Sequence, residues 1–144
     1  PISQRNLELT ESMYDGSRRN TLLSILDQTR TPMGARLIRH WVKQPLLCTA
    51  AICERQDAVA ACQANPRAIE QLRKHLDGVR DLERLIMKIS SDCASPRDLI
   101  ALQASFEPIP QIKMLLQSLT PESTLIRNEA EKLNHLPEMT TLIQ

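Results

Sequence analysis

Residues Thr31 to Leu46 read TPMGARLIRHWVKQPL, and this stretch predicts a helix with a defined start, end and two unlike faces. Thr31 can cap the free backbone amides, Pro32 suits the first helical position, and Pro45 prevents the helix from continuing. At about 100° per residue, apolar and basic side chains separate onto opposite sides. The apolar side holds Met33, Leu37, Ile38, Trp41 and Val42, and the basic side holds Arg36, Arg39, His40 and Lys43.

The basic side of this helix has two interpretations. It is either an ordinary solvated helix face or a surface held near nucleic-acid phosphates, and the second hypothesis concerns Arg36, Arg39 and Lys43 above all. Trp41 is expected to lie in the core and to anchor the helix there.

The composition outside this segment favours helices throughout. Only three glycines occur, and tryptophan, tyrosine and phenylalanine occur once each, so residues typical of strands and tight hairpins are scarce. We therefore predict an all-α fold, an irregular multi-helix bundle with a short extended segment, Arg5 to Thr10, near the N-terminus. A turn is expected at Asp15-Gly16-Ser17.

Four proline dipeptides mark helix starts, because in each a residue suited to capping precedes a proline. Ser95 also has Asp98 three residues later, as in a capping box with Asp in place of Glu. Glu107-Pro108-Ile109-Pro110 must break or kink the chain, since two backbone donors are lost. The four dipeptides are Thr31-Pro32, Asn65-Pro66, Ser95-Pro96 and Thr120-Pro121.

The helices expected from apolar spacing each present one stripe to a common core. Buried positions are expected at Ile52, Val59 and Cys62 in one helix and at Leu99, Leu102 and Phe106 in another. The expected helices are 22–26, the segment after Pro32, 49–63, 66–76, 79–89, 96–107, a helix ending near 119, one from 121, and a last one opening at Pro137.

Charge and motifs exclude several functions. The net charge of +1, from 18 basic and 17 acidic residues, lacks the strong positive field of a free-standing nucleic-acid binder. Three glycines cannot form a phosphate-binding loop or a dinucleotide fingerprint. Four cysteines without a Cys-x-x-Cys pair indicate free thiols and no metal site. No catalytic, cofactor-binding or metal-binding residue is predicted.

The chain lacks an apolar run of about 20 residues and a secretion signal, so a cytoplasmic location is expected. Because it starts at Pro1, we expect it to be an excised piece of a longer protein.

Asp81, Glu83 and Arg84 lie close together in the sequence, but their side chains point in different directions on a helix. This arrangement favours structural ion pairs over acid-base chemistry.

Four segments occur in an order and spacing that resemble one family. They are LLSILDQTRTPMGARLIRHWVKQPL (22–46), ICERQDAV (52–59), DLERL (81–85) and ASPRDLIAL (94–102), and RNLELT (5–10) is similar to the opening of the same domain. Together they resemble the core, or lever, domain (domain III) of the MutS family of DNA mismatch repair proteins. The resemblance covers Arg5 to about Leu116 and implies that residues 1–144 are the N-terminal part of that domain.

The resemblance implies a role in a larger, dimeric machine. In the family, one domain reads mismatches, clamps grip the DNA, and a C-terminal ATPase uses ATP and Mg. The chain shows none of these parts: its only phenylalanine, Phe106, is followed by Glu-Pro rather than x-Glu. We expect a non-catalytic helical segment that links reader and clamp to the ATPase. Implied partners are mismatched double-stranded DNA, a second protomer and a MutL-type repair protein, and no membrane is expected.

Charged positions that match the family motifs are expected to form structural pairs or interdomain contacts. Two alternatives remain at this point: a helical protein-interaction module unrelated to DNA, and the core of a MutS paralogue acting in recombination. The charged motif positions are Arg36, Arg55, Asp57, Asp81, Arg84, Arg97 and Asp98. Within the resemblance, Gly34 is expected to let its helix lie close to a neighbour, and Trp41 is expected to anchor that helix to the core.

Overall fold

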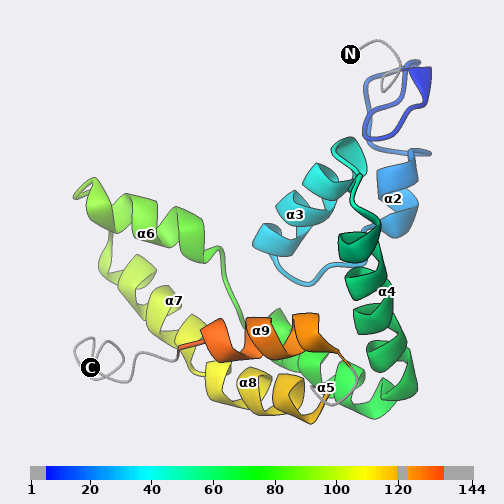
Figure 1. The fold of residues 1–144 in the computed structure, drawn as a ribbon. Helices are drawn as coiled ribbons and strands as arrows, with labels where there is room; N and C mark the ends of the chain where they lie inside the picture. Colours follow the sequence, from blue (N-terminus) through cyan, green and yellow to red (C-terminus); the bar gives the residue numbers. More distant parts are fainter. Residues whose placement is uncertain (1–5, 120–122, 135–144) are drawn as a thin grey trace. The chain divides into compact units, whose positions relative to one another are not determined.

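The computed structural model describes residues 6–119 and 123–134, and in this part of the chain all regular elements are helices (Figure 1). The prediction of an all-α fold is confirmed. The chain divides into two compact units, Pro1–Leu47 and Cys48–Gln144, which are described separately. Among the described helices, none is both long enough and apolar enough to cross a membrane.

The first unit contains α2 (Leu22–Leu26) and α3 (Pro32–Lys43), which pack together. The helix predicted after Thr31 is confirmed at its start, since Thr31 Oγ1 accepts from the Gly34 N–H at 3.1 Å. Its end is also confirmed, because the chain leaves the helix at Gln44, just before Pro45. Local sequence rules therefore fix this helix.

The expectation that Trp41 lies in the core is wrong. Trp41 is 39% exposed, and α3 has no buried residue although its apolar and basic faces are as predicted. The reason is a shortage of covering surface in this unit. The helix that packs against α3 is only five residues long, and Thr21 and Leu23 are the buried residues in the described part of the unit.

The expected extended segment at Arg5–Thr10 is also wrong: Asn6 is helical, Leu7–Thr10 form turns and bends, and Arg5 lies outside the described residues. Glu8 adopts a positive φ of 46°, and its carboxylate accepts from the Met13 N–H at 2.6 Å. This contact folds the segment back on itself. The predicted turn at 15–17 is confirmed, with Gly16 at φ 67° and the Ser17 N–H bound to Asp15.

The second unit is a set of paired helices. In it, α4 packs on α5 and α9, α8 packs on α5 and α9, and α6 packs on α7 (Figure 1). The hairpin formed by α6 and α7 therefore stands beside a body made of the other four helices. The bounds are α4 Thr49–Ala64, α5 Pro66–Asp77, α6 Leu82–Ser90, α7 Pro96–Phe106, α8 Ile109–Ser118 and α9 Thr124–Lys132.

The core of the second unit joins α4, α9 and the end of α8. Its buried members are Ala61, Leu119 and Ile126, and Ala58, Cys62, Ala68, Ile69 and Leu116 pack against them. The predicted inward positions on α4 are therefore only partly right. Cys62 packs on the core, but Ile52 is 36% and Val59 56% exposed. Small residues face inward on α4, which lets α9 approach closely.

The other predicted stripe, on α7, is right at two of its three positions. Leu102 is 2% exposed and Phe106 is half-buried, whereas Leu99 is 37% exposed. The helix α7 ends at Phe106, as the two prolines require, and α8 begins at Ile109. Glu107 and Pro108, between the two helices, keep right-handed helical dihedral angles. The backbone conformation therefore stays helical there although α7 and α8 are separate helices.

Of the predicted helix starts, those at Pro32, Pro66 and Pro96 are confirmed. The side chain of Asn65 does not cap α5; its Nδ2 donates to the Ala61 carbonyl at 3.0 Å instead. The helix expected from Pro121 starts at Thr124, where Ser123 caps it. Thr120, Pro121 and the helix expected at Pro137 lie outside the described residues.

One prediction concerns packing in α7. Replacing Leu102 by Ala should lower the free energy of unfolding of the 144-residue chain by about 2–5 kcal/mol, because it leaves a cavity at a site 2% exposed. Urea denaturation followed by circular dichroism measures the change. Ile100→Ala, in the same helix at a side chain 61% exposed, is the control. Equal midpoints for the two variants would contradict the burial of Leu102.

Candidate functional surfaces

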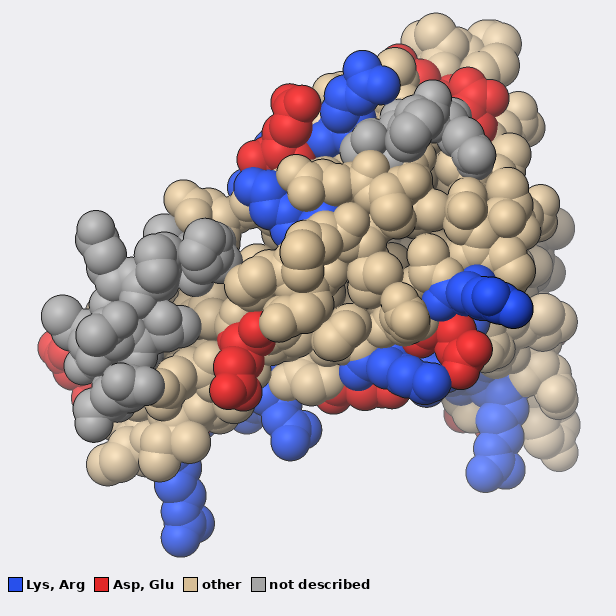
Figure 2. All heavy atoms as spheres, turned by 90° about the horizontal axis from the view of Figure 1, so that it is seen from below, with Lys and Arg blue, Asp and Glu red and all other residues tan. Residues whose placement is uncertain are grey.

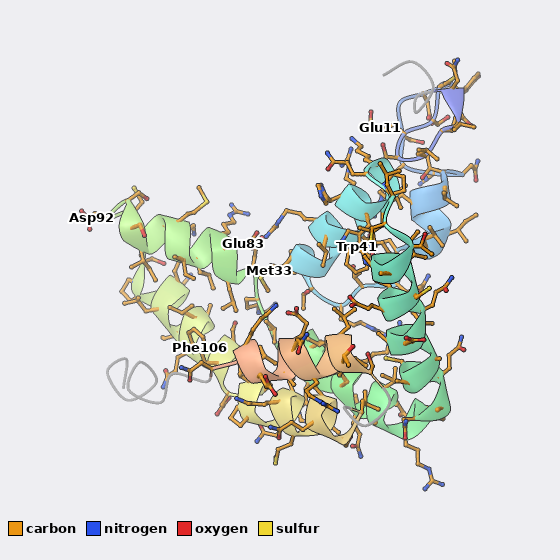
Figure 3. All side chains as sticks on the ribbon, in the orientation of Figure 1. Glu11, Met33, Trp41, Glu83, Asp92 and Phe106 are labelled. Carbon is orange, nitrogen blue, oxygen red and sulfur yellow. The ribbon has the colours of Figure 1, made fainter. Side chains whose placement is uncertain are left out.

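The basic face of α3 is exposed at Arg36, Arg39 and His40, while Lys43 is half-buried. Arg39 is paired within its own unit: its Nη2 lies 2.6 Å from Oε1 of Glu11, in the loop before α2 (Figure 3). The pair neutralises part of the positive charge that phosphates would meet. Contact of Arg36, Arg39 and Lys43 with DNA therefore stays a prediction, and it would depend on a local rather than a strong field.

Gly34 makes a close approach possible at the start of α3. A Cβ at this position would lie 3.1 Å from Thr31 Oγ1 and 3.3 Å from Thr29 Cβ. The neighbour that packs closely against Gly34 is thus the segment before the helix, which contains Thr29 and Thr31. Thr29 is itself fixed, because its hydroxyl donates to Asp27 at 2.6 Å.

Two charged motif positions, Arg55 and Asp57, lie on α4, and neither is buried. Arg55 is half-buried and Asp57 is exposed. Figure 2 shows basic and acidic side chains interspersed among uncharged residues on the face in view, without one extended patch of a single sign. A structural or interdomain role for Arg55 and Asp57 stays a prediction.

The remaining motif positions gather in the α6–α7 hairpin. Asp81 caps α6, and its Oδ1 accepts from the Arg84 N–H at 3.3 Å. Arg84 and Arg97 are exposed, and neither guanidinium forms an ion pair with a residue that the structure describes. Of the two predictions for these arginines, an ion pair is therefore not observed among the described residues, and an interdomain contact stays a prediction.

Asp98 brings the two helices of the hairpin together. The predicted capping box is present, since the Ser95 hydroxyl accepts from the Asp98 N–H and the Asp98 carboxylate accepts from the Ser95 N–H at 2.9 Å. The other carboxylate oxygen lies 2.7 Å from Lys88 Nζ on α6. These contacts, the Lys88 hydrogen bond first and then those to Ser95, hold the pKa of Asp98 well below its usual range.

Sequence reasoning missed two side chains that join helices. Ser105 is fully buried, donates to the Ala101 carbonyl at 2.7 Å and accepts from the Arg80 N–H at 3.0 Å. Lys113 on α8 donates to the Leu133 carbonyl just beyond α9 at 2.7 Å, where a cation suits the negative helix end. No sequence pattern marks either residue, because the partners are 25 and 20 positions away.

The described residues hold no cluster of three or more His, Cys, Asp or Glu side chains able to bind a metal ion. Cys48, Cys53 and Cys93 are exposed free thiols, and burial raises the pKa of the half-buried Cys62 thiol. A hollow of about 450 Å³ lies between the end of α5 and the α7–α8 junction. Its lining mixes basic, acidic and apolar groups, from Lys74, His75, Gly78, Ala104, Glu107, Pro108 and Gln111.

The Asp98 contacts predict a pH dependence. Because the folded-state pKa lies below the usual value of 3.8, the stabilisation by Asp98 is present above that pH and is lost as the pH falls. Asp98→Asn should therefore lower the urea midpoint at pH 7, and the difference from wild type should shrink toward pH 2. Asp57→Asn, at an exposed carboxylate of α4, is the control. A difference independent of pH would show that the Asp98 charge does not contribute.

Comparison with known proteins identifies relatives of this chain. Residues 3–144 match the family model described as MutS domain III. The chain is 51% identical over 142 residues to the DNA mismatch repair protein MutS of Protochlamydia amoebophila, covering 99% of this chain and 16% of the relative. It is 44% identical over 142 residues to the MutS of Pelotomaculum thermopropionicum, covering 99% of this chain and 16% of that protein.

A third relative, the MutS of Lachnoclostridium phytofermentans, is 43% identical over 141 residues, or 98% of this chain and 15% of the relative. The chain thus spans about one sixth of the length of these relatives. The alternative of a helical interaction module outside this family is excluded by matches of this identity and coverage. The four sequence motifs, the all-helical fold and the family match agree: the chain belongs to the MutS domain III family.

Proposed function

We propose that this segment is a non-catalytic helical link in a MutS protein, connecting the mismatch reader and the DNA clamp to an ATPase. The observation that carries the proposal is the core of the second unit. Ala61 is far along the chain from Leu119 and Ile126, and all three side chains are nearly excluded from solvent together. A close-packed interior resists gradual deformation, so displacement of one helix is passed to the others.

The parts that such a link would serve lie outside this chain. ATP and Mg would bind to the ATPase of the parent protein, and mismatched double-stranded DNA would bind through its reader and clamp. A second protomer and a MutL-type repair protein are the further partners that we infer. The expected cytoplasmic location, and action in repair rather than recombination, belong to the same proposal. The mismatch-repair names of the relatives favour repair.

The first prediction concerns the isolated chain. It should neither hydrolyse ATP nor distinguish mismatched from fully paired duplex, because it lacks the glycines of a phosphate-binding loop. A phosphate-release assay and gel-shift titrations with both duplexes measure the two activities. Turnover above a buffer control, or tighter binding of the mismatch, would contradict the proposal.

The second prediction concerns transmission in the full-length parent protein. Leu119→Ala should loosen the core at a side chain 1% exposed. We expect ATP hydrolysis and mismatch binding to persist separately, while the change in hydrolysis rate on adding mismatched DNA becomes smaller. Met114→Ala, on α8 at a side chain 62% exposed, should leave this change as in the wild type. A wild-type response in Leu119→Ala would argue against transmission through this core.

A further inference from the structure

The helix α6 is attached to the second unit by few contacts. It packs on α7, whereas α8 packs on both α5 and α9. Leu85 is its one buried residue, and Ile86 and Met87 on its outer side are 51% and 71% exposed. Figure 3 places Glu83 near one end of α6 and Asp92 just beyond the other, at the tip of the hairpin. Detaching α6 would expose Leu85 and the half-buried Leu82 and Ile89, but it would leave the core of Ala61, Leu119 and Ile126 covered.

The contacts that hold α6 at its two ends differ in their burial. Toward the tip, Lys88 pairs with Asp98, and both side chains are partly exposed, at 39% and 16%. An ion pair that solvent reaches holds α6 less firmly than a fully buried contact does. At the other end, the segment leading into α6 is bound by the fully buried hydroxyl of Ser105, which accepts the Arg80 N–H at 3.0 Å. Val79, next to Arg80, is 6% exposed.

The Ser105 hydroxyl serves both helices of the hairpin. It donates its proton to the Ala101 carbonyl of α7 at 2.7 Å, which leaves its oxygen free to accept from Arg80. Removing the hydroxyl would leave the Arg80 N–H without this acceptor beside a buried position, and an unsatisfied donor is more costly than a missing bond at the surface. We call this pair of hydrogen bonds the Ser105 bridge.

We infer that α6 opens as a separate unit while α4, α5, α8 and α9 stay folded, and that the Ser105 bridge retains it. Local opening of this kind is expected where an element has few buried apolar contacts. The inference concerns the folded chain itself and does not depend on the proposed link to an ATPase. Its failure would leave that proposal untouched.

Native-state hydrogen exchange at increasing urea tests the separate opening in the 144-residue chain. Amides of α6, from Leu85 to Ser90, should exchange with a shallow dependence on urea, because opening of one helix exposes less surface than global unfolding. Amides near Ile112 on α8 and Ile126 on α9 should show the steep dependence of global unfolding. Equal slopes for α6 and α8 would overturn the inference.

The role of the bridge is tested by Ser105→Ala. Exchange of the Arg80 amide and of the α6 amides should become about tenfold faster at low urea, with the shallow slope retained. Ser118→Ala is the matched control, because the Ser118 hydroxyl donates to the Leu115 carbonyl of its own helix at 2.6 Å and is exposed. Ser118→Ala should leave α6 exchange as in the wild type.

Wild-type exchange of α6 in Ser105→Ala would show that the bridge does not retain the helix. Acceleration of equal size in Ser118→Ala would show the same. If Ser105→Ala loses all protection, Ser105→Cys replaces it, since the thiol keeps similar volume and is a weaker acceptor. Faster exchange of α6 in that variant would support the bridge, and unchanged exchange would refute it.

Discussion

The close approach of α4 to α9 is the constraint on which the second unit depends. Ala61 permits it, because its small methyl side chain leaves room for Ile126 and Leu119 to pack against α4. Ala58 and Ala68 keep the surroundings equally small. A larger side chain at Ala61 would push apart helices from the beginning and the end of the unit. This packing, rather than any charged group, joins distant parts of the chain.

The α6–α7 hairpin is built on a different principle. Its helices meet through polar contacts at both ends, with Asp98 and Lys88 near the tip and Ser105 near the body. Polar contacts fix geometry, but they contribute less to stability than apolar burial when solvent reaches them. One unit therefore combines a tightly packed body with a loosely held helix, and the two should respond differently to neighbouring domains.

Site residues predicted by resemblance differ in how much the structure says about them. Asp98 and Asp81 have a local structural role, since the carboxylate of each accepts a hydrogen bond from a backbone amide at the start of a helix. Arg84 and Arg97 are exposed, and an interdomain contact for them stays a prediction. On α3, the pairing of Arg39 with Glu11 reduces the charge available to DNA, and sequence spacing alone did not reveal that pair.

The sequence alone determined the helical class, most helix bounds, the Ser95 capping box and the family, because these depend on residues within four positions of one another or on ordered motifs. The tertiary structure decided which faces are buried. It placed Ala61 inward instead of Val59, left Trp41 partly exposed, and joined Ser105 to Arg80. Burial depends on what surface a distant segment supplies, and helical periodicity carries no information about that segment.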